Sequence, residues 1–217
     1  IPGLGIVFKG NIITKKIVTI LYKIAIQRKH KIIFQNPDDY NVFLDEKLVK
    51  AEQCSLILSS GVDTEYFKVT PSIVENNTVK FGVMARLLWS KGIGEFVEAS
   101  HKIYNKYSNA EFIILGSPDS GSKDSIPYEW LEKVNSEYNY ITWIKHAEDV
   151  RPFLNDIDVF VLPSYYPEGV PKSLIESASF SLPLITTDTP GCKEVVENKY
   201  NGYLIKPNDV DELVSSM

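Results

Sequence analysis

The sequence predicts an α/β fold organised around a mainly parallel sheet. From residue 79 onward, short apolar segments typical of buried strands alternate with longer amphipathic segments typical of helices, which indicates βαβ units. Apolar residues make up 44% and charged residues 24% of the 217 residues, values typical of globular domains rather than disordered chains. Ligands of an open parallel sheet bind outside the carboxyl ends of its strands, so we expect a site in the loops after the strands.

The first sixty residues predict helix, strand, helix and strand in turn. Ile13–Gln27 is an amphipathic helix whose polar strip lies opposite a wide apolar arc. Lys31–Gln35 fits a buried strand, and the following Asn36–Asp39 has the residues of a helix start: an N-cap, a proline and acids in the first turn. Cys54–Leu58 is another short apolar run. The apolar arc of the first helix consists of Ile17, Ile20, Leu21 and Ile24.

Residues 61–78 have turn residues and little periodicity, so they predict a linker between residues 1–60 and 79–217. The strands expected after it are Val79–Ala85, Glu111–Leu115, Tyr140–Ile144, Asp158–Leu162, Leu184–Thr187 and Tyr203–Ile205. The helices expected there are Gly94–Tyr107, Tyr128–Tyr138, Val150–Asn155, Pro171–Phe180, Cys192–Glu197 and a last one from Asp209 that stops in mid-course. The chain starts without an initiator methionine or a signal-peptide pattern, so we expect it to be a piece of a longer protein.

Charge is distributed unevenly along the chain. Residues 1–35 hold seven Lys or Arg and no acid (+7), the other residues hold 16 Lys or Arg and 28 acids (−12), and the sum is −5. A basic end on an acidic body suggests an anionic partner, a membrane or a nucleic acid, and the alternative is one solvated helix face. No apolar run reaches the roughly 18 residues that a membrane-spanning helix needs.

Several kinds of site are excluded by residue spacing. The two cysteines, Cys54 and Cys192, stand in unrelated contexts, so neither a disulfide framework nor a cysteine-based zinc site is expected. The histidines show no ligand spacing, and the P-loop, nucleophile-elbow and HExxH motifs are absent. The D-x-D at residues 156–158 has the form of some metal-bound sugar-nucleotide sites. It precedes a strand, at the wrong end for the ligand side, so we expect a structural or solvated role.

Two glutamates flank the start of a predicted helix that follows a strand. Glu168 lies in the loop and Glu176 lies about a turn and a half into the helix, with Pro171 suited to its first position. A helix N-terminus attracts phosphate through its free N–H groups, and Gly169 lets the backbone approach a ligand closely. A carboxylate accepts well from the vicinal hydroxyls of a sugar. The alternative is that both glutamates are surface charges.

A second loop carries two cations at the end of the strand that starts at Val79. Arg86 ends this strand, and Lys91 lies just before the next helix. Two cations beside a helix N-terminus suit a diphosphate, and the alternative is a surface salt bridge. Because both loops follow parallel strands, we expect them at the same edge of the sheet, which favours one shared site.

Together these stretches resemble the retaining glycosyltransferases of family 4 (group 1), which have the GT-B fold of two Rossmann-like domains. The resemblance spans nearly the whole chain, and the E-x7-E element combined with the Arg…Lys loop carries it. The matching stretches are GVMARLLWSKGIGEFVEA (82–99), FIILGSPDS (112–120), DVFVLPSYYPEGVPKSLIESA (158–178) and TTDTPGCKEVVENKYNGYLI (186–205), preceded by GLGIVF (3–8), FQNPDD (34–39) and SSGVDTEYF (59–67).

The resemblance implies a division of labour between the parts. Residues 79–217 correspond to the nucleotide-sugar donor domain without its full closing helix, and residues 1–60 correspond to the last part of the acceptor-side domain. Glu176 is expected to hold the ribose of the donor, and Glu168 is expected to lie beside the donor hexose. Arg86 and Lys91 are expected to bind the diphosphate and to stabilise the leaving nucleotide as charge develops.

The resemblance also implies secondary contacts with the donor. Backbone groups at Gly169 and Val170 are expected to add to the diphosphate site, and Gly116, Lys145 and His146 are expected to flank the base. No metal and no other cofactor is expected, because the two cations and the helix N-terminus can neutralise a pyrophosphate.

The function implied is transfer of a hexose, with retention, from a nucleotide sugar to a lipid-linked or polysaccharide acceptor in cell-surface glycan biosynthesis. A UDP-sugar is favoured over a GDP-sugar. We expect a cytoplasmic protein that contacts the inner face of the membrane through the basic helix at 13–31, without a nucleic-acid partner. The 217 residues alone are expected to be inactive. The alternatives are a nucleotide-sugar-binding piece without catalysis, and another GT-B enzyme such as a sugar-nucleotide epimerase or a phosphorylase.

Overall fold

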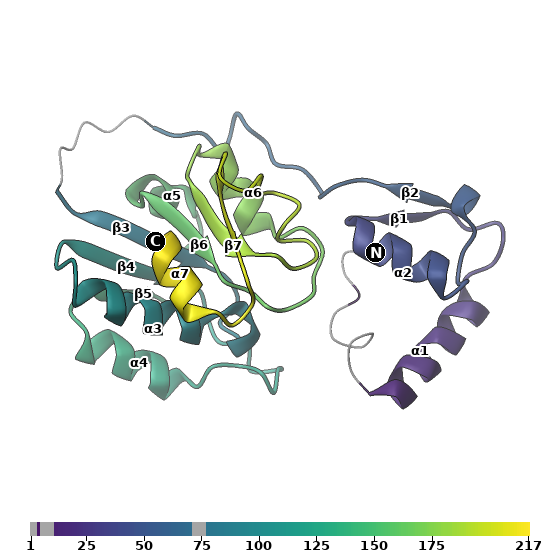
Figure 1. Cartoon of the computed structure of the whole chain (residues 1–217), viewed down its shortest axis with the longest axis horizontal. Helices are drawn as coiled ribbons and strands as arrows, with labels where there is room; N and C mark the ends of the chain where they lie inside the picture. Colours follow the sequence, from purple (N-terminus) through teal and green to yellow (C-terminus); the bar gives the residue numbers. More distant parts are fainter. Residues whose placement is uncertain (1–3, 5–10, 71–76) are drawn as a thin grey trace.

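The structure, a computed structural model, describes Leu4 and residues 11–70 and 77–217, which form a small unit and a large unit (Figure 1). The small unit is the part before residue 61, and the large unit is the part from residue 77 onward. Most of the GLGIVF stretch, Lys9 and residues 71–76 of the expected linker lie outside the described residues. Each unit has a hydrophobic core of its own.

The small unit follows the predicted order of elements. Its helices and strands are α1 (Ile12–Ala25), β1 (Ile32–Phe34), α2 (Pro37–Asp45) and β2 (Cys54–Leu56), with a 3-10 turn at Ala51–Gln53 before β2. The two strands pair in parallel, with Phe34 opposite Leu56. Helix α2 begins as predicted, because the Asn36 side chain accepts a hydrogen bond from the Asp39 N–H at 2.8 Å. Phe34 and Phe43 are fully buried between these elements.

Helix α1 is amphipathic as predicted, but its apolar arc faces outward. Tyr22 and Ile26 pack against the core of the small unit, and the Lys15 ammonium lies 2.6 Å from the Glu46 carboxylate. The exposed fraction of Ile24 reaches 71%, and no residue of α1 is fully buried. The large apolar residues of α1 that remain exposed are Ile12, Ile13, Ile17, Ile20, Leu21 and Ile24.

The large unit is built on a six-stranded parallel sheet whose order is β5-β4-β3-β6-β7-β8. The strands are β3 (Val79–Met84), β4 (Ala110–Leu115), β5 (Ile141–Ile144), β6 (Val159–Leu162), β7 (Leu184–Thr187) and β8 (Gly202–Ile205). This is the order of a doubly wound dinucleotide-binding sheet, and its direction of winding reverses between β3 and β6. The strands are mostly apolar on both faces because helices cover the sheet on both sides.

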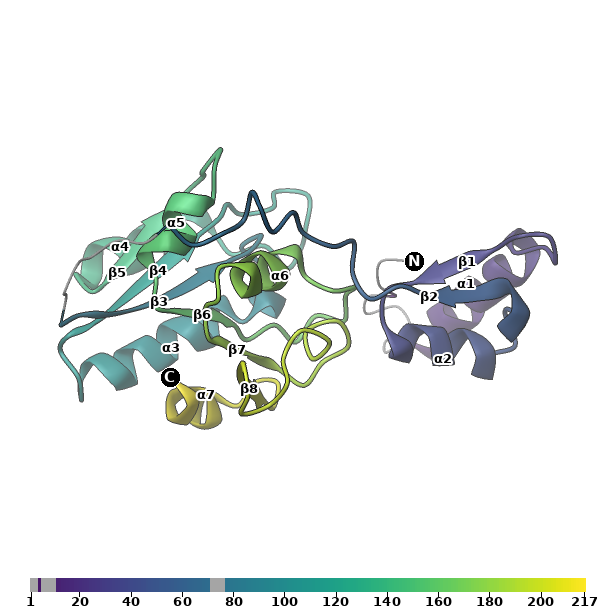
Figure 2. The same cartoon turned by 90° about the horizontal axis from the view of Figure 1, so that it is seen from above.

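Helices cover the two faces of this sheet (Figure 2). They are α3 (Ile93–Tyr104), α4 (Tyr128–Glu137), α5 (Arg151–Asp156), α6 (Lys172–Ser179) and α7 (Val210–Ser216). Helices α3 and α7 pack together below the sheet in Figure 2, and α5 and α6 lie above it. The connections change from one face of the sheet to the other between β3 and β6. This leaves a crevice where these two strands diverge, which is the usual ligand position in such sheets.

One predicted helix is wrong: Cys192–Glu197 is an irregular turn. Part of its main chain bonds to a side chain instead of continuing a helical ladder. The Glu197 N–H donates to the Asn201 side chain at 2.8 Å, and Asn201 Nδ2 donates to the Val195 carbonyl at 3.0 Å. A short polar side chain that offers such partners competes with helix formation.

The structural role expected for the D-x-D is confirmed. Asp158 accepts a hydrogen bond from the Lys80 N–H at 2.8 Å, and Asp156 accepts one from the Lys80 ammonium at 2.7 Å. Both contacts join α5 and β6 to the amino end of β3, away from the ligand edge. Among the described residues, no cluster of three or more His, Cys, Asp or Glu is arranged to hold a metal ion, and no helix is long and apolar enough to cross a membrane.

Candidate functional site

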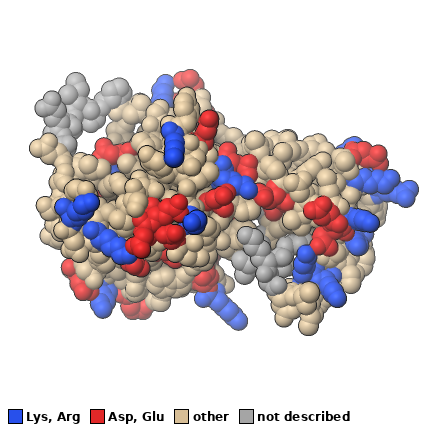
Figure 3. Space-filling view, in the orientation of Figure 1, with Lys and Arg blue, Asp and Glu red and all other residues tan. Residues whose placement is uncertain are grey.

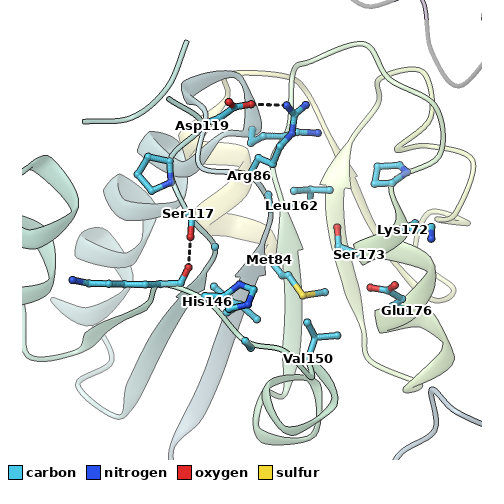
Figure 4. Close-up of a pocket in the computed structure, with 18 of the residues that line it drawn as sticks. Met84, Arg86, Ser117, Asp119, His146, Val150, Leu162, Lys172, Ser173 and Glu176 are labelled. Atoms are coloured by element: carbon cyan, nitrogen blue, oxygen red, sulfur yellow. Dashed lines mark hydrogen bonds and ion pairs between the residues drawn. The ribbon is translucent and has the colours of Figure 1, made fainter. Parts of the chain in front are cut away.

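A cavity of about 800 Å³ opens at the carboxyl ends of the strands, where β3 and β6 diverge (Figure 4). Its walls come from the ends of β3, β4, β5 and β6 and from the first turns of α6. Both the position and the volume fit a small-molecule site in a doubly wound sheet.

Seven of the nine residues predicted from the sequence line this cavity. They are Arg86, Lys91, Gly116, Lys145, His146, Glu168 and Glu176. Gly169 and Val170 are not on its wall, and contact of their backbone groups with a ligand therefore stays a prediction. The structure thus brings together residues from the segments that follow four different strands and from helix α6, up to 90 positions apart in the sequence.

Lys91 and Glu168 form an ion pair at the wall of the cavity. Only 8% of the Lys91 side chain and 21% of the Glu168 side chain are exposed, so the pair is shielded from solvent. An ammonium has three N–H donors, and the contact with one carboxylate oxygen leaves capacity for a ligand anion. The Lys91 ammonium can therefore still donate hydrogen bonds to a phosphate while it is paired with Glu168.

The turn that carries Lys91 is fixed by hydrogen bonds to two other loops. The Ser90 N–H and hydroxyl both donate to the Asp124 carboxylate. The Ser90 carbonyl accepts from the N–H groups of Tyr165 and Tyr166 at 2.9 and 3.2 Å. These bonds hold the turn after β3 against the loop after β6, and this is what brings Lys91 next to Glu168.

Arg86 forms a salt bridge, which is the alternative that the sequence left open beside a diphosphate contact. Its guanidinium donates to the Asp119 carboxylate at 2.8 Å, and 63% of its side chain is exposed. Figure 4 shows this pair at the upper rim of the cavity, with the guanidinium turned away from Glu176. Arg86 is therefore within the site but held at its rim by a neighbouring loop.

Glu176 is half-buried on α6 and faces the cavity (Figure 4). Burial raises the pKa of its carboxyl above the usual range, and the Lys172 charge offsets part of this effect. Within the described part of the chain, no residue donates a hydrogen bond to this carboxylate. It is therefore a free acceptor that is directed at whatever enters the cavity.

The N-terminus of α6 adds hydrogen-bond donors to the same wall. Pro171 precedes the helix and makes no side-chain cap, and the first bond within the helix is from the Ile175 N–H to the Pro171 carbonyl. The N–H groups of Lys172 and Ser173, both in the cavity lining, therefore have no partner within the helix. Such N–H groups and the helix dipole favour an anion.

Gly116 shapes the floor of the cavity. Its φ is +150°, and a Cβ atom on it would lie 2.0 Å from the Ala85 carbonyl oxygen, so only glycine fits there. The Gly116 N–H bonds to the Ile144 carbonyl at 3.0 Å, and its carbonyl accepts from the Trp143 indole at 2.9 Å. These bonds fix the backbone after β4 beside the space left for a ligand.

Lys145 and His146 differ in how they face this space. The Lys145 ammonium bonds to the Tyr128 hydroxyl and lies 3.7 Å from the Glu132 carboxylate, both on α4. The imidazole of His146 is exposed and lies over the cavity in Figure 4. A planar ligand group near the end of β5 would therefore meet His146 rather than the charge of Lys145.

Sequence reasoning missed other residues of the lining: Ser117, Asp119, Lys172 and Ser173. Ser117 donates to the Lys145 carbonyl and ties the loop after β4 to the loop after β5. A polar residue near the carboxyl end of a parallel strand is a candidate for the site. The sequence alone does not show which of these candidates face the cavity.

The residues of the lining have a definite chemical bias. The lining combines the cations Arg86 and Lys91 with the N-terminus of α6, the carboxylate of Glu176 and the exposed imidazole of His146. Cations and helix N–H groups bind phosphate oxygens, and a carboxylate accepts from sugar hydroxyls. The arrangement suits a ligand with both a diphosphate and a sugar.

Comparison with known proteins points in the same direction. The family model described as Glycosyl transferases group 1 matches residues 78–217. A similar protein in Campylobacter jejuni, N,N'-diacetylbacillosaminyl-diphospho-undecaprenol alpha-1,3-N-acetylgalactosaminyltransferase, is 27% identical over 95% of this chain and 54% of its own length. A second, the Escherichia coli UDP-Gal:alpha-D-GlcNAc-diphosphoundecaprenol alpha-1,3-galactosyltransferase, is 27% identical over 94% of this chain and 55% of its own.

Solved structures share the fold. HepE of Anabaena, determined with UDP and glucose, superposes with a TM-score of 0.78 at 19% identity, over 95% of this chain and 57% of its own. Sucrose-phosphate synthase of Thermosynechococcus elongatus gives a TM-score of 0.76 at 21% identity, over 93% of this chain and 51% of its own. These likenesses confirm the predicted GT-B-type fold. The chain spans about half the length of the relatives that it matches.

Proposed function

Because the chain belongs to the group 1 family of glycosyl transferases, we propose that it carries the donor half of a retaining glycosyltransferase that uses a UDP-sugar. The observation that carries the proposal is the cavity where β3 and β6 diverge. Its lining combines cations and a helix N-terminus, which suit a diphosphate, with the free carboxylate of Glu176. The UDP-Gal in the name of the E. coli relative supports a UDP-linked donor. In this proposal, residues 79–217 bind the donor and residues 1–60 belong to the acceptor side.

We assign each part of the donor to a wall of the cavity. Glu176 accepts from the ribose hydroxyls, the N–H groups at the start of α6 meet the diphosphate, and His146 flanks the base. Lys91 contacts the diphosphate with the N–H donors that Glu168 leaves free. Arg86 joins it after leaving Asp119, since a doubly charged diphosphate is a stronger partner than one exposed carboxylate.

The proposed chemistry is electrostatic stabilisation of a leaving group. When the bond between the anomeric carbon and the diphosphate oxygen breaks, negative charge grows on that oxygen. Lys91 and the helix N-terminus already face that charge, and Arg86 adds to them once it has left Asp119, which lowers the barrier with little reorganisation of solvent. Glu168, held by Lys91, lies where the hexose is expected and orients it. We expect binding to persist in EDTA, because these groups supply the positive charge themselves.

The acceptor proposed is a lipid-linked saccharide in cell-surface glycan biosynthesis. Both relatives described above have a diphospho-undecaprenol acceptor in their names, and a capsular polysaccharide glycosyltransferase of Staphylococcus aureus, CapM, is 27% identical over 83% of this chain. The competing candidate, a sugar-nucleotide epimerase, needs no acceptor, so product analysis with and without the acceptor separates the two.

Contact with the membrane is proposed for helix α1. Its exposed apolar arc lies beside the exposed cations Lys16 and Lys23, as in helices that lie at a lipid interface. Figure 3 shows further Lys and Arg side chains at the outer end of the small unit, among acidic ones. Lys15 is paired with Glu46, and Lys31 donates to the Glu52 carbonyl, so the charge available to lipid is smaller than the sequence alone suggests.

Vesicle sedimentation tests this contact. Lys16→Glu/Lys23→Glu is expected to reduce binding to vesicles that contain phosphatidylserine about tenfold or more, because each surface cation contributes about 1 kcal/mol. Neutral phosphatidylcholine vesicles and the matched variant Lys102→Glu, on α3 of the large unit, serve as controls. Equal binding of the double variant and the unaltered protein would contradict the proposal.

Asp119 is expected to restrain Arg86 and so to compete with the donor. Asp119→Asn should raise the affinity for UDP-galactose about two- to fivefold, because it frees a guanidinium that the exposed ion pair otherwise holds at a cost of up to about 1 kcal/mol. The free energy of unfolding should change by less than about 0.5 kcal/mol. Calorimetric titration checks the first value. A loss of affinity instead would show that Asp119 itself contacts the donor.

A further inference from the structure

The start of α2 in the small unit touches the loop that carries Glu168 in the large unit. Figure 2 shows the loops of the large unit that approach the N-terminal end of α2. Asn36, at this end, is fully buried, and its amide nitrogen lies 3.4 Å from the main-chain carbonyl oxygen of Glu168. Two residues on, the Asp38 carboxylate lies 3.0 Å from the Lys193 ammonium. The two contacts join the units close to the cavity.

The orientation of the Asn36 amide is determined by the cap that it forms. Its oxygen accepts from the Asp39 N–H at 2.8 Å, so its nitrogen must face the opposite way. This nitrogen donates one hydrogen to the Asp39 carboxylate at 2.9 Å. The other hydrogen is left for the Glu168 carbonyl, which is its partner across the interface. Because the amide is already fixed, it loses little conformational entropy when it bonds to the Glu168 carbonyl.

The same Glu168 peptide is confined from the other side by Gly191. Its φ is +88°, and a Cβ atom on it would lie 2.5 Å from the Glu168 carbonyl oxygen and 2.2 Å from that of Gly169. The loop after β7 thus packs directly against this backbone. Lys193 follows in the same loop, and the bond to Asp38 raises the pKa of its ammonium. The main chain of Glu168 therefore lies between Gly191 of its own unit and Asn36 of the other.

We propose that Asn36 is a positioning residue that couples the seating of the small unit to the placement of Glu168 in the cavity. The distance of 3.4 Å exceeds the usual 2.9–3.0 Å of an N–H···O bond, and a small approach of the units would bring it into that range. The Asp38–Lys193 ion pair fixes where the two units meet in this approach. The inference rests on the proposed function, because it assigns Glu168 to the donor hexose.

The test compares donor binding with turnover in the variant Asn36→Ser. Serine keeps a side-chain oxygen to cap α2 but removes the amide hydrogen directed at Glu168. In the intact enzyme we expect the affinity for UDP to stay within about twofold of the unaltered protein. We expect kcat for hexose transfer to fall about three- to tenfold, the effect of one neutral hydrogen bond on a barrier. Asn41→Ser, an exposed position of the same helix, is the matched control and should change neither value.

A charge exchange provides a second arm that leaves the cap untouched. Asp38→Lys and Lys193→Asp should each lower kcat, and the double variant should restore it in part, because the pair is re-formed with reversed signs. An unchanged kcat in Asn36→Ser with intact UDP binding would overturn the inference, and so would a loss of UDP affinity as large as the loss of kcat. Failure of the unaltered protein to bind UDP would contradict the proposed function itself and is visible before any substitution is made.

Discussion

Lys91→Met is expected to lower the free energy of unfolding by about 3 kcal/mol and to slow hexose transfer at least about a hundredfold. The first effect arises because the substitution leaves the Glu168 carboxylate in a site where only 21% of its side chain is exposed, without its cationic partner. The second arises because the cation that faces the leaving diphosphate is lost. Urea denaturation measures the first quantity, and initial rates with saturating UDP-galactose measure the second.

The two effects of Lys91 can be separated with a second substitution. Lys91→Met/Glu168→Gln removes the uncompensated charge, so much of the stability should return while transfer stays slow. Lys123→Met, at an exposed position of the neighbouring loop, is the matched control and should change neither quantity appreciably. If the single Lys91 variant were as stable and as active as the unaltered protein, the ion pair would have neither of the roles given to it here.

Glu176→Gln is expected to weaken binding of UDP-galactose roughly a hundredfold, which is about 3 kcal/mol. The carboxylate is half-buried and, within the described residues, accepts no hydrogen bond in the free protein, so both of its oxygens are available for ribose hydroxyls. Hydrogen bonds to a charged acceptor are worth about 1.5–3 kcal/mol each, and an amide replaces them only in part. Calorimetric titration measures the change. Glu129→Gln, an exposed glutamate of α4, is the matched control.

The same carboxylate predicts a pH dependence of donor binding. Because burial raises the pKa of Glu176, protonation begins at a pH above the usual range of a glutamate. The ionised form is the acceptor, so affinity should fall as the pH falls through this raised pKa. The diphosphate of UDP-galactose is esterified at both ends and does not titrate there. The acid limb should be absent in Glu176→Gln, and its persistence there would assign it to another group.

Local sequence signals predict most of the fold because the elements of the large unit have strong periodicity. The apolar run at β6, the glycine after it and the proline before α6 place a helix N-terminus at the ligand edge, and the structure has it there. The turn at Cys192–Glu197 was missed because its partner, Asn201, enters from outside the segment. Local propensity contains no information on such a competitor.

The candidate site, too, was predictable only in part. Residues at the carboxyl ends of parallel strands must share an edge, so Arg86, Lys91, Glu168 and Glu176 could be grouped from spacing alone. Their pairings could not, because the bond of Arg86 to Asp119 depends on how a loop 33 residues away folds back. For α1, periodicity predicted two faces correctly. Only the packing of Tyr22 and Ile26 on the small unit shows which face turns inward.

The central claim is that the cavity where β3 and β6 diverge holds the nucleotide sugar. A crystal structure of the protein with UDP-galactose in EDTA tests it most directly. We predict that the ribose hydroxyls lie within hydrogen-bond distance of the Glu176 carboxylate, that the diphosphate contacts Lys91 and the N-terminus of α6, and that Arg86 has left Asp119. A donor bound elsewhere, or bound in this cavity with its ribose away from Glu176 and its diphosphate away from Lys91, would contradict the account.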